Sequence, residues 1–321
     1  RTRKSSLSAP MVLCLKARES RTLPGLSKMK NFIIVTGGAG FVGSNLIEIL
    51  LKQTNYKIIS LDNYSSGSKK NHIKDNRVDY IKGNTSNIEK ILKKKKNKIK
   101  CIFHFGEFAR IFQSFKKFDE CYQSNTIGSK SVFKFCLDNK IKLIYSATSA
   151  SLGNYGKDKN LSPYAFTKSK NLELLENLKK WFDFRFEVIF FYNVYGPRQI
   201  QKGDMSTVIG VFERLYQNKK PLTVVRPGSQ TRRFTHIFDT VQVCFEAFKS
   251  DRCKYYSISS KKLYTILDVA KMFKSKIIFL KPRLGERYAS ALTKIANNNK
   301  IIQKYGKLQL KDYISYFIKS Q

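Results

Sequence analysis

A glycine-rich turn between an apolar strand and an amphipathic helix is the feature that most constrains the fold. The apolar segment 31–36 ends at Gly37, and glycines recur at Gly40 and Gly43 as the amphipathic stretch 41–52 begins. Glycines at this spacing allow a tight turn, let a pyrophosphate approach the backbone, and let the helix pack close to the strand. The N–H groups at the helix start then face the anion. The residues predicted to hold a dinucleotide here are Gly37, Gly40, Phe41, Val42 and Gly43.

An acidic residue after the second predicted strand distinguishes between two dinucleotides. The strand predicted over 57–61 is followed by Asp62, 19 residues after Gly43. A carboxylate at this place accepts hydrogen bonds from the adenosine ribose and repels a 2′-phosphate. The cofactor predicted from these residues is NAD rather than NADP.

Strand and helix patterns alternate along most of the chain. Further strands are predicted over 78–81, 101–105, 143–146 and 187–191, and further helices over 88–96, 125–139 and 164–182. This alternation predicts βαβ units and a parallel sheet that is covered on both faces. The fold class expected is therefore α/β, with a Rossmann-type doubly wound parallel sheet. We assign it to residues 29–195 and assign a smaller C-terminal substrate-binding region to 196–321, of which about 235–248 returns to the Rossmann domain.

Residues 1–28 differ in composition from the rest of the chain. They contain four Arg but no Ile, Asn, Phe or Tyr, and this bias changes at Met29. We interpret them as a non-native leader, translated upstream of a start at Met29. An organelle transit peptide is the alternative, because the stretch is rich in Arg and Ser and has one acidic residue.

The chain is strongly basic, with 61 Lys and Arg against 23 Asp and Glu and a formal net charge of +38. Such a balance raises nucleic acid as a partner. The lysines, however, are scattered along the chain rather than gathered in a stripe, so nucleic acid is not the partner expected. A catalytically inactive fold member that binds RNA stays as the alternative from another functional class.

Composition also bears on membranes, metals and redox state. No apolar run approaches the roughly 18 residues of a membrane span, so no membrane partner is expected. The six cysteines contain no CxxC pair and the three histidines are separated, so no metal site is expected. Reduced thiols and a cytoplasmic location are the expectation, because no secretory signal is apparent.

A tyrosine and a lysine four residues apart form the second chemical motif. Tyr164 and Lys168 follow Ser162-Pro163, a favourable helix opening, so both side chains are predicted on one helix face. They also lie shortly after Thr148, which follows a predicted strand. Two further Tyr/Lys pairs with this spacing fall in a Gly- and Asn-rich loop and just before a proline, and neither has a comparable partner.

Seven segments appear in a characteristic order along the chain: TGGAGFVG, LDNYSSG, CIFHFGEFA, YSATSASLG, SPYAFTK, FFYNVYGPRQ and GSQTRRF. In this order they resemble the extended short-chain dehydrogenases/reductases, specifically their NAD-dependent nucleotide-sugar epimerase/dehydratase group, and look closest to the UDP-glucose 4-epimerase branch. The resemblance runs from about Met29 to the C-terminus. It implies an isomerase of carbohydrate metabolism, a UDP-hexose 4-epimerase that acts through a transient 4-keto intermediate, and a homodimer. A nucleotide-sugar reductase or dehydratase of the same fold is the alternative.

The resemblance assigns roles to three side chains. Tyr164, as phenolate, would take the proton of the sugar 4-hydroxyl. A free tyrosine has a pKa near 10, so the Lys168 ammonium and the positive nicotinamide ring would together lower it for work as a base at neutral pH. Lys168 would also hold the nicotinamide ribose. Thr148, or failing it Ser149, would hydrogen-bond to the same sugar oxygen.

Other residues match positions that contact cofactor or substrate in this group. The expected cofactor contacts, beside the glycine turn and Asp62, are Asn63, Asn84, Thr85, Phe105, Asn125, Ser146, Tyr164, Lys168 and Phe191. The expected contacts to the nucleotide diphosphate are Asn193, Arg232 and Arg283. Arginine suits a diphosphate because its planar guanidinium donates two parallel hydrogen bonds. Turn capping is the alternative role for Asn125 and Asn193, and solvated surface charge is the alternative for Arg232.

Three departures from the group's pattern matter. Gly83-Asn84-Thr85 lacks the aspartate that usually follows the third strand, and Gly106-Glu107 stands where two small residues are usual. Glu107 would either place a negative charge near the nicotinamide or point away. The segment Thr148-Ser149-Ala150 lacks the Asp-Glu pair of sugar 4,6-dehydratases, which disfavours that reaction.

Overall fold

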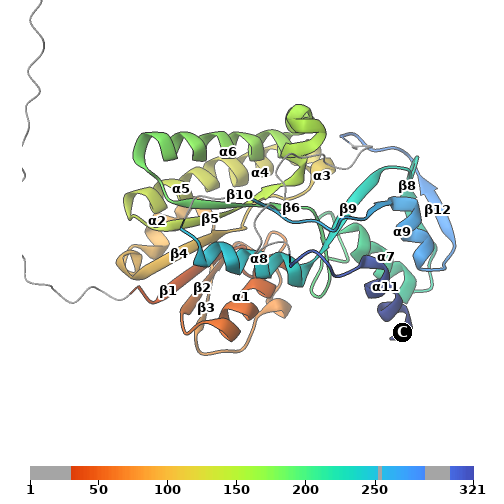
Figure 1. Cartoon of the computed structure of the whole chain (residues 1–321), viewed down its shortest axis with the longest axis horizontal. Coiled ribbons are helices and arrows are strands. Elements are labelled where there is room, and N and C mark those ends of the chain that lie inside the picture. The colour runs from red at the N-terminus through yellow and green to blue at the C-terminus, as the bar shows by residue number, and fades with distance from the viewer. Residues whose placement is uncertain (1–29, 252–254, 286–303) are drawn as a thin grey trace, which may run out of the picture.

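A seven-stranded parallel sheet forms the centre of the computed structural model (Figure 1). The structure describes residues 30–251, 255–285 and 304–321, apart from the side chains of 152–156, so the segment 1–28 lies outside the described residues. The strands of this sheet are β1 (Phe32–Thr36), β2 (Lys57–Asp62), β3 (Val78–Lys82), β4 (Ile99–His104), β5 (Lys142–Thr148), β6 (Phe186–Phe191) and β10 (Tyr255–Ser257). Their spatial order is β10-β6-β5-β4-β1-β2-β3, and every pair is parallel. The predicted fold class is confirmed.

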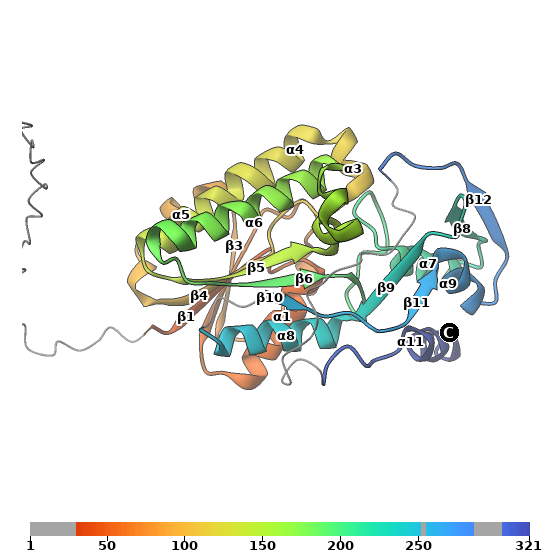
Figure 2. The same ribbon diagram turned by 45° about the horizontal axis from the view of Figure 1, so that its top comes forward.

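Helices cover both faces of the sheet, as Figures 1 and 2 show. One layer consists of α2 (Ile88–Leu92), α5 (Ser129–Asp138) and α6 (Pro163–Phe182), and the other of α1 (Phe41–Gln53) and α8 (Ile237–Lys249). Alternate residues of β1 serve the two layers, because Ile34 packs in the first core while Ile33 and Val35 pack in the second. Burial on both faces explains why the strands read as continuous apolar runs.

The register places the carboxyl ends of the strands along one edge. Thr36 lies opposite Leu61 of β2 and His104 of β4, and Thr148 lies opposite Phe191 of β6. The loops that follow these strands therefore begin next to one another. This edge is where open parallel sheets bind ligands.

A smaller body with its own apolar core adjoins that edge (Figure 2). Its elements are β7 (Asn193–Tyr195), α7 (Val208–Gln217), β8 (Leu222–Val225), β9 (Thr231–His236), β11 (Leu263–Thr265), α9 (Ile266–Met272), β12 (Ile277–Leu280) and α11 (Leu310–Lys319). The chain returns to the large sheet between them, since α8 packs beside α1 and β10 pairs with β6. The division into residues 29–195 and 196–321 stays a prediction.

Short helical segments complete the described chain. They are η1 (Lys69–Asn71), η2 (Thr85–Asn87), η3 (Lys96–Lys98), α3 (Ile111–Lys116), α4 (Phe118–Tyr122), η4 (Gln123–Gly128) and η5 (Ser149–Asn160). The helix predicted over 88–96 is too long, because α2 ends at Leu92 where a run of lysines begins; like charges four residues apart destabilise a helix. The first part of the helix predicted over 125–139 is the π-turn of η4. No helix among the described residues combines the length and apolar character needed to cross a membrane.

Candidate active site

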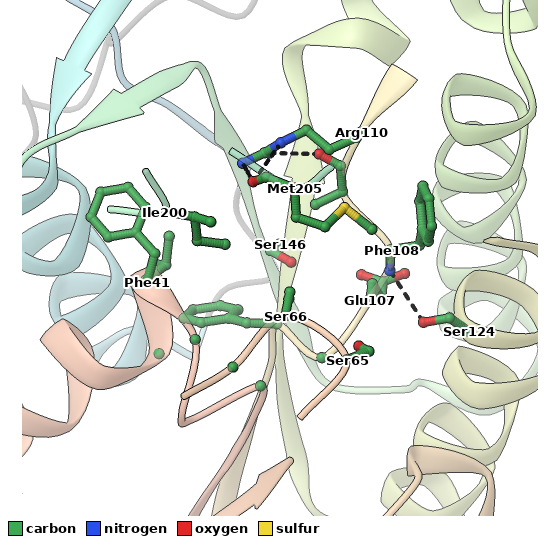
Figure 3. A pocket seen from close by; sticks show the side chains of 18 of the residues that line it. Phe41, Ser65, Ser66, Glu107, Phe108, Arg110, Ser124, Ser146, Ile200 and Met205 are labelled. Atoms are coloured by element: carbon green, nitrogen blue, oxygen red, sulfur yellow. Dashed lines mark hydrogen bonds between the residues drawn. The ribbon is translucent and has the colours of Figure 1, made fainter. Parts of the chain in front are cut away.

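A cavity of about 1060 Å³ lies at the carboxyl edge of the sheet and continues into the smaller body (Figure 3). Its lining includes residues predicted from three separate features of the sequence: the glycine turn, the tyrosine motif and the family resemblance. Those residues are Gly37, Gly40, Phe41, Val42, Gly43, Asp62, Asn63, Asn84, Thr85, Phe105, Ser146, Thr148, Tyr164, Lys168, Phe191, Asn193 and Arg232. Two predicted residues, Asn125 and Arg283, are not among its lining residues.

The backbone of the glycine turn is packed too closely for side chains at Gly37 and Gly43. Gly37 has a positive φ of 69°, and a Cβ there would lie 2.9 Å from the backbone of Gly106. A Cβ on Gly43 would lie 2.2 Å from the carbonyl oxygen of Gly37. Helix α1 begins after Gly40, which supplies no side-chain cap. The N–H groups of the first turn are thus available to a phosphate, as a dinucleotide requires.

Two backbone N–H groups fix the carboxylate of Asp62, the last residue of β2, beside the glycine turn. Its Oδ2 accepts a hydrogen bond from the Ala39 N–H at 3.0 Å, and its Oδ1 accepts one from the Tyr64 N–H at 2.7 Å. Burial raises the pKa of the Asp62 carboxyl, and the two backbone hydrogen bonds oppose that rise. Next to it, the Asn63 amide donates to Asn84 Oδ1 at 2.9 Å. The carboxylate is held still beside the glycine turn, so these residues fit a dinucleotide that lacks a 2′-phosphate.

Tyr164 lies in the first turn of α6, and the local sequence explains its position. Ser162 caps the helix by accepting from the Ala165 N–H at 3.1 Å, and Pro163 occupies the first helical position, where no N–H is needed. The Tyr164 N–H donates to Ser114 Oγ at 3.2 Å. Burial raises the pKa of the Tyr164 phenol to about 12, while a hydrogen bond with the Thr148 side chain lowers it. The phenol therefore needs further positive charge before it can act as a base at neutral pH.

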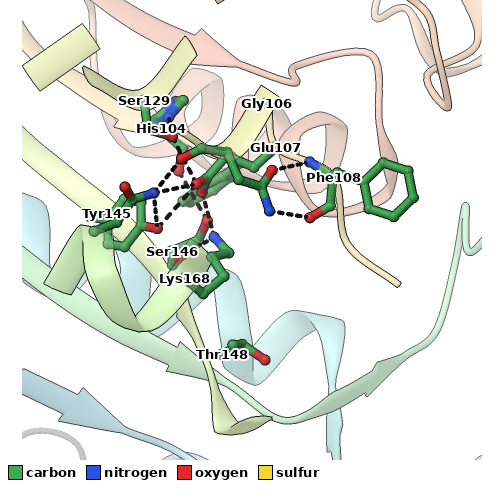
Figure 4. A network of polar contacts seen from close by, with 12 residues as sticks. His104, Gly106, Glu107, Phe108, Ser129, Tyr145, Ser146, Thr148 and Lys168 are labelled. Carbon is green, nitrogen blue, oxygen red and sulfur yellow. Dashed lines mark hydrogen bonds and ion pairs between the residues drawn. The ribbon is translucent and has the colours of Figure 1, made fainter. Parts of the chain in front are cut away.

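Lys168 lies one turn after Tyr164, and its ammonium contacts the carboxylate of Glu107 (Figure 4). The same ammonium donates to the Ser146 carbonyl and lies 4.6 Å from the centre of the Tyr145 ring. The two side chains are 4% and 2% exposed. Burial lowers the pKa of Lys168, and the charge of Glu107 opposes that change. The sequence left open whether Glu107 points into the site or away from it. In the structure its side chain points inward and pairs with Lys168.

A chain of side-chain hydrogen bonds runs from Glu107 through Ser129 and His104 to Thr36, the residue before the glycine turn. Glu107, Ser129 and His104 are labelled in Figure 4. Ser129 Oγ donates to Glu107 Oε1 at 2.8 Å and lies 2.9 Å from His104 Nε2; His104 Nδ1 lies 2.8 Å from Thr36 Oγ1. The single hydroxyl proton of Ser129 is used on Glu107, so His104 donates through Nε2 and accepts at Nδ1 from Thr36. Burial lowers the pKa of His104 to about 4, which keeps the ring neutral.

Other donors complete the hydrogen bonds of the Glu107 carboxylate. Tyr145 Oη and Asn171 Nδ2 donate to Oε1 at 3.0 and 3.2 Å. A buried carboxylate is tolerated only with such partners. The Glu107 carboxylate is therefore fully paired within the site and is not an isolated buried charge.

The remaining predicted residues have different surroundings. Asn125 is buried under the site, where its Oδ1 accepts from the Phe108 N–H at 2.7 Å and its Nδ2 donates to the Phe108 carbonyl at 3.1 Å. Asn193 donates to the Arg233 carbonyl at 2.9 Å. Arg232, which is 9% exposed, donates to the Thr231 carbonyl at 2.8 Å. The Arg283 guanidinium is exposed and lies 5.5 Å from the centre of the Phe112 ring.

Arg110 belongs to the cavity wall, and the sequence analysis did not select it. Its Nε and Nη2 donate to the Met205 carbonyl at 3.0 and 2.6 Å, and its Nη1 donates to the Ala109 carbonyl at 2.7 Å (Figure 3). Met205 in turn packs against the apolar cluster that contains Tyr164. The sequence around Arg110 shows only a cation three residues after Glu107, and Arg110 belongs to none of the motifs described above.

Comparisons with known proteins agree with this geometry. A family model described as the NAD dependent epimerase/dehydratase family matches residues 33–258. Over 258 residues, 75% of this chain and 80% of the relative, the chain is 28% identical to ADP-L-glycero-D-manno-heptose-6-epimerase of Brachyspira hyodysenteriae. It is 30% identical to an uncharacterized UDP-glucose epimerase of Bacillus subtilis, over 65% of this chain and 70% of the relative.

A solved structure is similar over almost the whole chain. The UDP-glucuronic acid 4-epimerase of Bacillus cereus, in complex with UDP-glucuronic acid and NAD, matches with a TM-score of 0.79 and 25% identity. The match covers 90% of this chain and 99% of that one. The names of these three proteins share the word epimerase and differ in the sugar.

Proposed function

The chain belongs to the NAD dependent epimerase/dehydratase family, and from that premise we propose that it is a nucleotide-sugar epimerase, most specifically a UDP-hexose 4-epimerase. NAD is the cofactor. The residues that would hold it are the glycine turn at the pyrophosphate, Asp62 at the adenosine ribose and Lys168 at the nicotinamide ribose.

The observation that carries this proposal is the placement of Tyr164. Its phenol lines the same cavity as the glycine turn, beside Thr148. NAD, when bound, supplies the position that takes a hydride from the sugar carbon and returns it. Tyr164 would accept the proton of the sugar hydroxyl as the ketone forms and would give it back when the ketone is reduced. Thr148 would hold the same oxygen in place.

The choice of a UDP-hexose rests on the far wall of the cavity and on the relatives. Arg232 and Asn193 line the cavity beyond Tyr164, on β9 and at the start of β7, and a guanidinium there suits a diphosphate. A dehydratase needs an acid next to the threonine, and Ser149 and Ala150 occupy those places. Glu107, the carboxylate nearest the tyrosine motif among the cavity-lining residues, is already paired with Lys168. These features favour epimerisation over loss of water.

Incubation with nucleotide sugars tests the proposal. Purified protein is given UDP-galactose, UDP-N-acetylgalactosamine or UDP-glucuronate without added NAD, and the products are separated by chromatography. We expect the C4 epimer from at least one of them and none from Tyr164→Phe. No turnover on any nucleotide sugar would contradict the proposal. An accumulating 4-keto product would indicate the dehydratase, net NADH consumption would indicate the reductase, and salt-sensitive RNA affinity without bound NAD would indicate the RNA-binding alternative.

We also propose a homodimer formed through the layer of α4, η4 and α6. Phe118, Tyr122, Ile127 and Phe166 are large apolar side chains on this layer, and each is between 39% and 52% exposed. Phe118 and Tyr122 stack with ring centres 5.9 Å apart. Apolar side chains gathered on one outer layer are typical of a surface that another subunit covers.

A further inference from the structure

The positive charge of Lys168 is already matched by a negative one. Its ammonium is paired with Glu107, and both side chains are almost fully buried. Seen from Tyr164, a cation and an anion that lie together act as a dipole, whose field falls off faster than that of a single charge. The effect of the Lys168 charge on the Tyr164 phenol is therefore weakened by Glu107, the residue that departs from the group's pattern.

Arg110 is a second cation near the phenol. It stands immediately before α3, the helix whose Ser114 accepts the backbone N–H of Tyr164, and the cavity lining includes both Arg110 and Tyr164. Its guanidinium donates to the carbonyls of Met205 and Ala109, and no carboxylate pairs with it among the described residues. Carbonyl partners leave the full positive charge in place. The charge of Arg110 lowers the pKa of Tyr164, whereas the charge of Glu107 raises it.

The other groups that face Tyr164 do not supply this charge. Thr148 at the end of β5 is a neutral hydrogen-bond partner. Cys121 on α4 is a buried thiol whose pKa is raised to about 11, so it is neutral. Tyr145 on β5 is likewise a buried phenol with a raised pKa. Of the remaining charged residues that line the cavity near α3 and α4, Lys117 is paired with Asp204 at 3.5 Å, and Glu120 and Lys202 are exposed.

We propose that Arg110 is a positioning residue that stabilises the Tyr164 phenolate by its charge, while Lys168, neutralised by Glu107, serves as an oriented donor to the cofactor ribose. The two roles that one lysine usually combines are thus divided between two cations. This inference rests on the proposed role of Tyr164 as the base. It does not depend on which nucleotide sugar is the substrate.

The ionisation of Tyr164 tests the proposal directly, without any substrate. In the NAD-loaded enzyme, tyrosinate absorbance near 295 nm is titrated for each variant and for the same variant carrying Tyr164→Phe, and the difference isolates this phenol. We expect Arg110→Gln to move the titration up by about one pH unit, because an adjacent guanidinium shifts a pKa by about that much or more. Arg110→Lys, which keeps the charge, should move it back toward the parent value.

A matched pair of controls separates Arg110 from Lys168. The double variant Glu107→Gln/Lys168→Met removes the ion pair together, so it should leave the Tyr164 titration almost unchanged while weakening NAD binding. Lys116→Gln removes an exposed positive charge from the same helix and should change neither. A shift in the double variant larger than that in Arg110→Gln would overturn the proposal, because Lys168 would then be the effective cation.

The pH dependence of turnover supplies a second readout once a substrate is known. The acid limb of the kcat/KM profile reports the pKa of the base in the substrate-free enzyme. Arg110→Gln should move this limb to higher pH, which lowers kcat/KM about tenfold at pH values below the limb. If Arg110 only fastens the loop at Met205, KM rises and neither the limb nor the tyrosinate titration moves; that result also overturns the inference. A shifted titration in an enzyme that turns over no nucleotide sugar would sustain the inference and reject the proposed function.

Discussion

The carboxylate of Glu107 and the ammonium of Lys168 form an ion pair in the interior, with only 2% and 4% of the side chains exposed. Each partner has further hydrogen bonds, from Tyr145 and Asn171 to the carboxylate and from the ammonium to the Ser146 carbonyl. Removing one member of such a pair leaves an uncompensated buried charge, which costs more than the pair itself contributes. The pair therefore ties the stability of the protein to the residues of its site.

Glu107→Gln alone should lower the free energy of unfolding by about 3 kcal/mol, because Lys168 is left without its anion. The double variant Glu107→Gln/Lys168→Met should recover part of that loss. Urea denaturation of the NAD-free protein measures both. The exposed pair between Lys134 and Asp138 is the control, and Asp138→Asn should leave the midpoint almost unchanged. A Glu107→Gln midpoint equal to that of the parent would contradict the buried pair.

The stability of the protein should fall in mild acid because of His104. Burial lowers the pKa of this ring to about 4, whereas its value in the unfolded chain is near 6.5. The unfolded state then binds the additional proton, so the contribution is complete above about pH 6.5 and is lost as the pH falls toward 4. The loss should reach about 3 kcal/mol. Unfolding free energies at several pH values check it, and His104→Gln should flatten this part of the profile; an unchanged slope in that variant would assign the loss to other groups.

Asp62→Asn should weaken NAD binding about tenfold, or about 1.4 kcal/mol. The amide no longer offers two acceptor oxygens, and the backbone N–H groups of Ala39 and Tyr64 compete for the one that remains. The preference for NAD over NADP should narrow at the same time, because the negative charge that repels a 2′-phosphate is gone. Calorimetric titration of NAD-stripped protein measures both affinities. Asp79→Asn, an exposed aspartate on β3, should change neither.

Phe118→Glu combined with Phe166→Glu should convert the proposed dimer into a monomer. The two side chains are 52% and 41% exposed on the α4 and α6 layer, and buried carboxylates would face each other across the interface. Light scattering coupled to gel filtration gives the mass. Phe238→Glu, on α8 in the opposite layer and 48% exposed, is the matched control. A parent protein that is monomeric at all concentrations tested would contradict the proposal.

The sheet could be predicted from the sequence because each central strand is apolar on both faces. The strand predicted over 57–61 appears as β2 with one more residue, Asp62, and the helix predicted over 164–182 appears as α6 with Pro163 added. The glycine turn could also be predicted, because its chemistry depends on residues that are adjacent in sequence. Both predictions rest on local patterns that burial and turn geometry enforce.

The surroundings of the tyrosine motif could not be predicted in the same way. Whether Glu107 turns inward depends on Ser129, Tyr145 and Lys168, which come from three elements 22 to 61 residues away along the chain. No periodicity encodes such a meeting. The position of Arg110 also depends on a distant residue, since its acceptor Met205 lies 95 residues further on.

The hydrogen-bond chain from Thr36 through His104 and Ser129 to Glu107 has a single direction, because each hydroxyl has one proton to give. Thr36 also accepts the N–H groups of Phe105 and Gly106, and it precedes Gly37 of the phosphate turn. The residue before the phosphate turn and the carboxylate that pairs with Lys168 thus belong to one polar network. Redesign of the turn at Thr36 would remove the proton donor to His104 and would alter the network that holds Glu107 on Lys168.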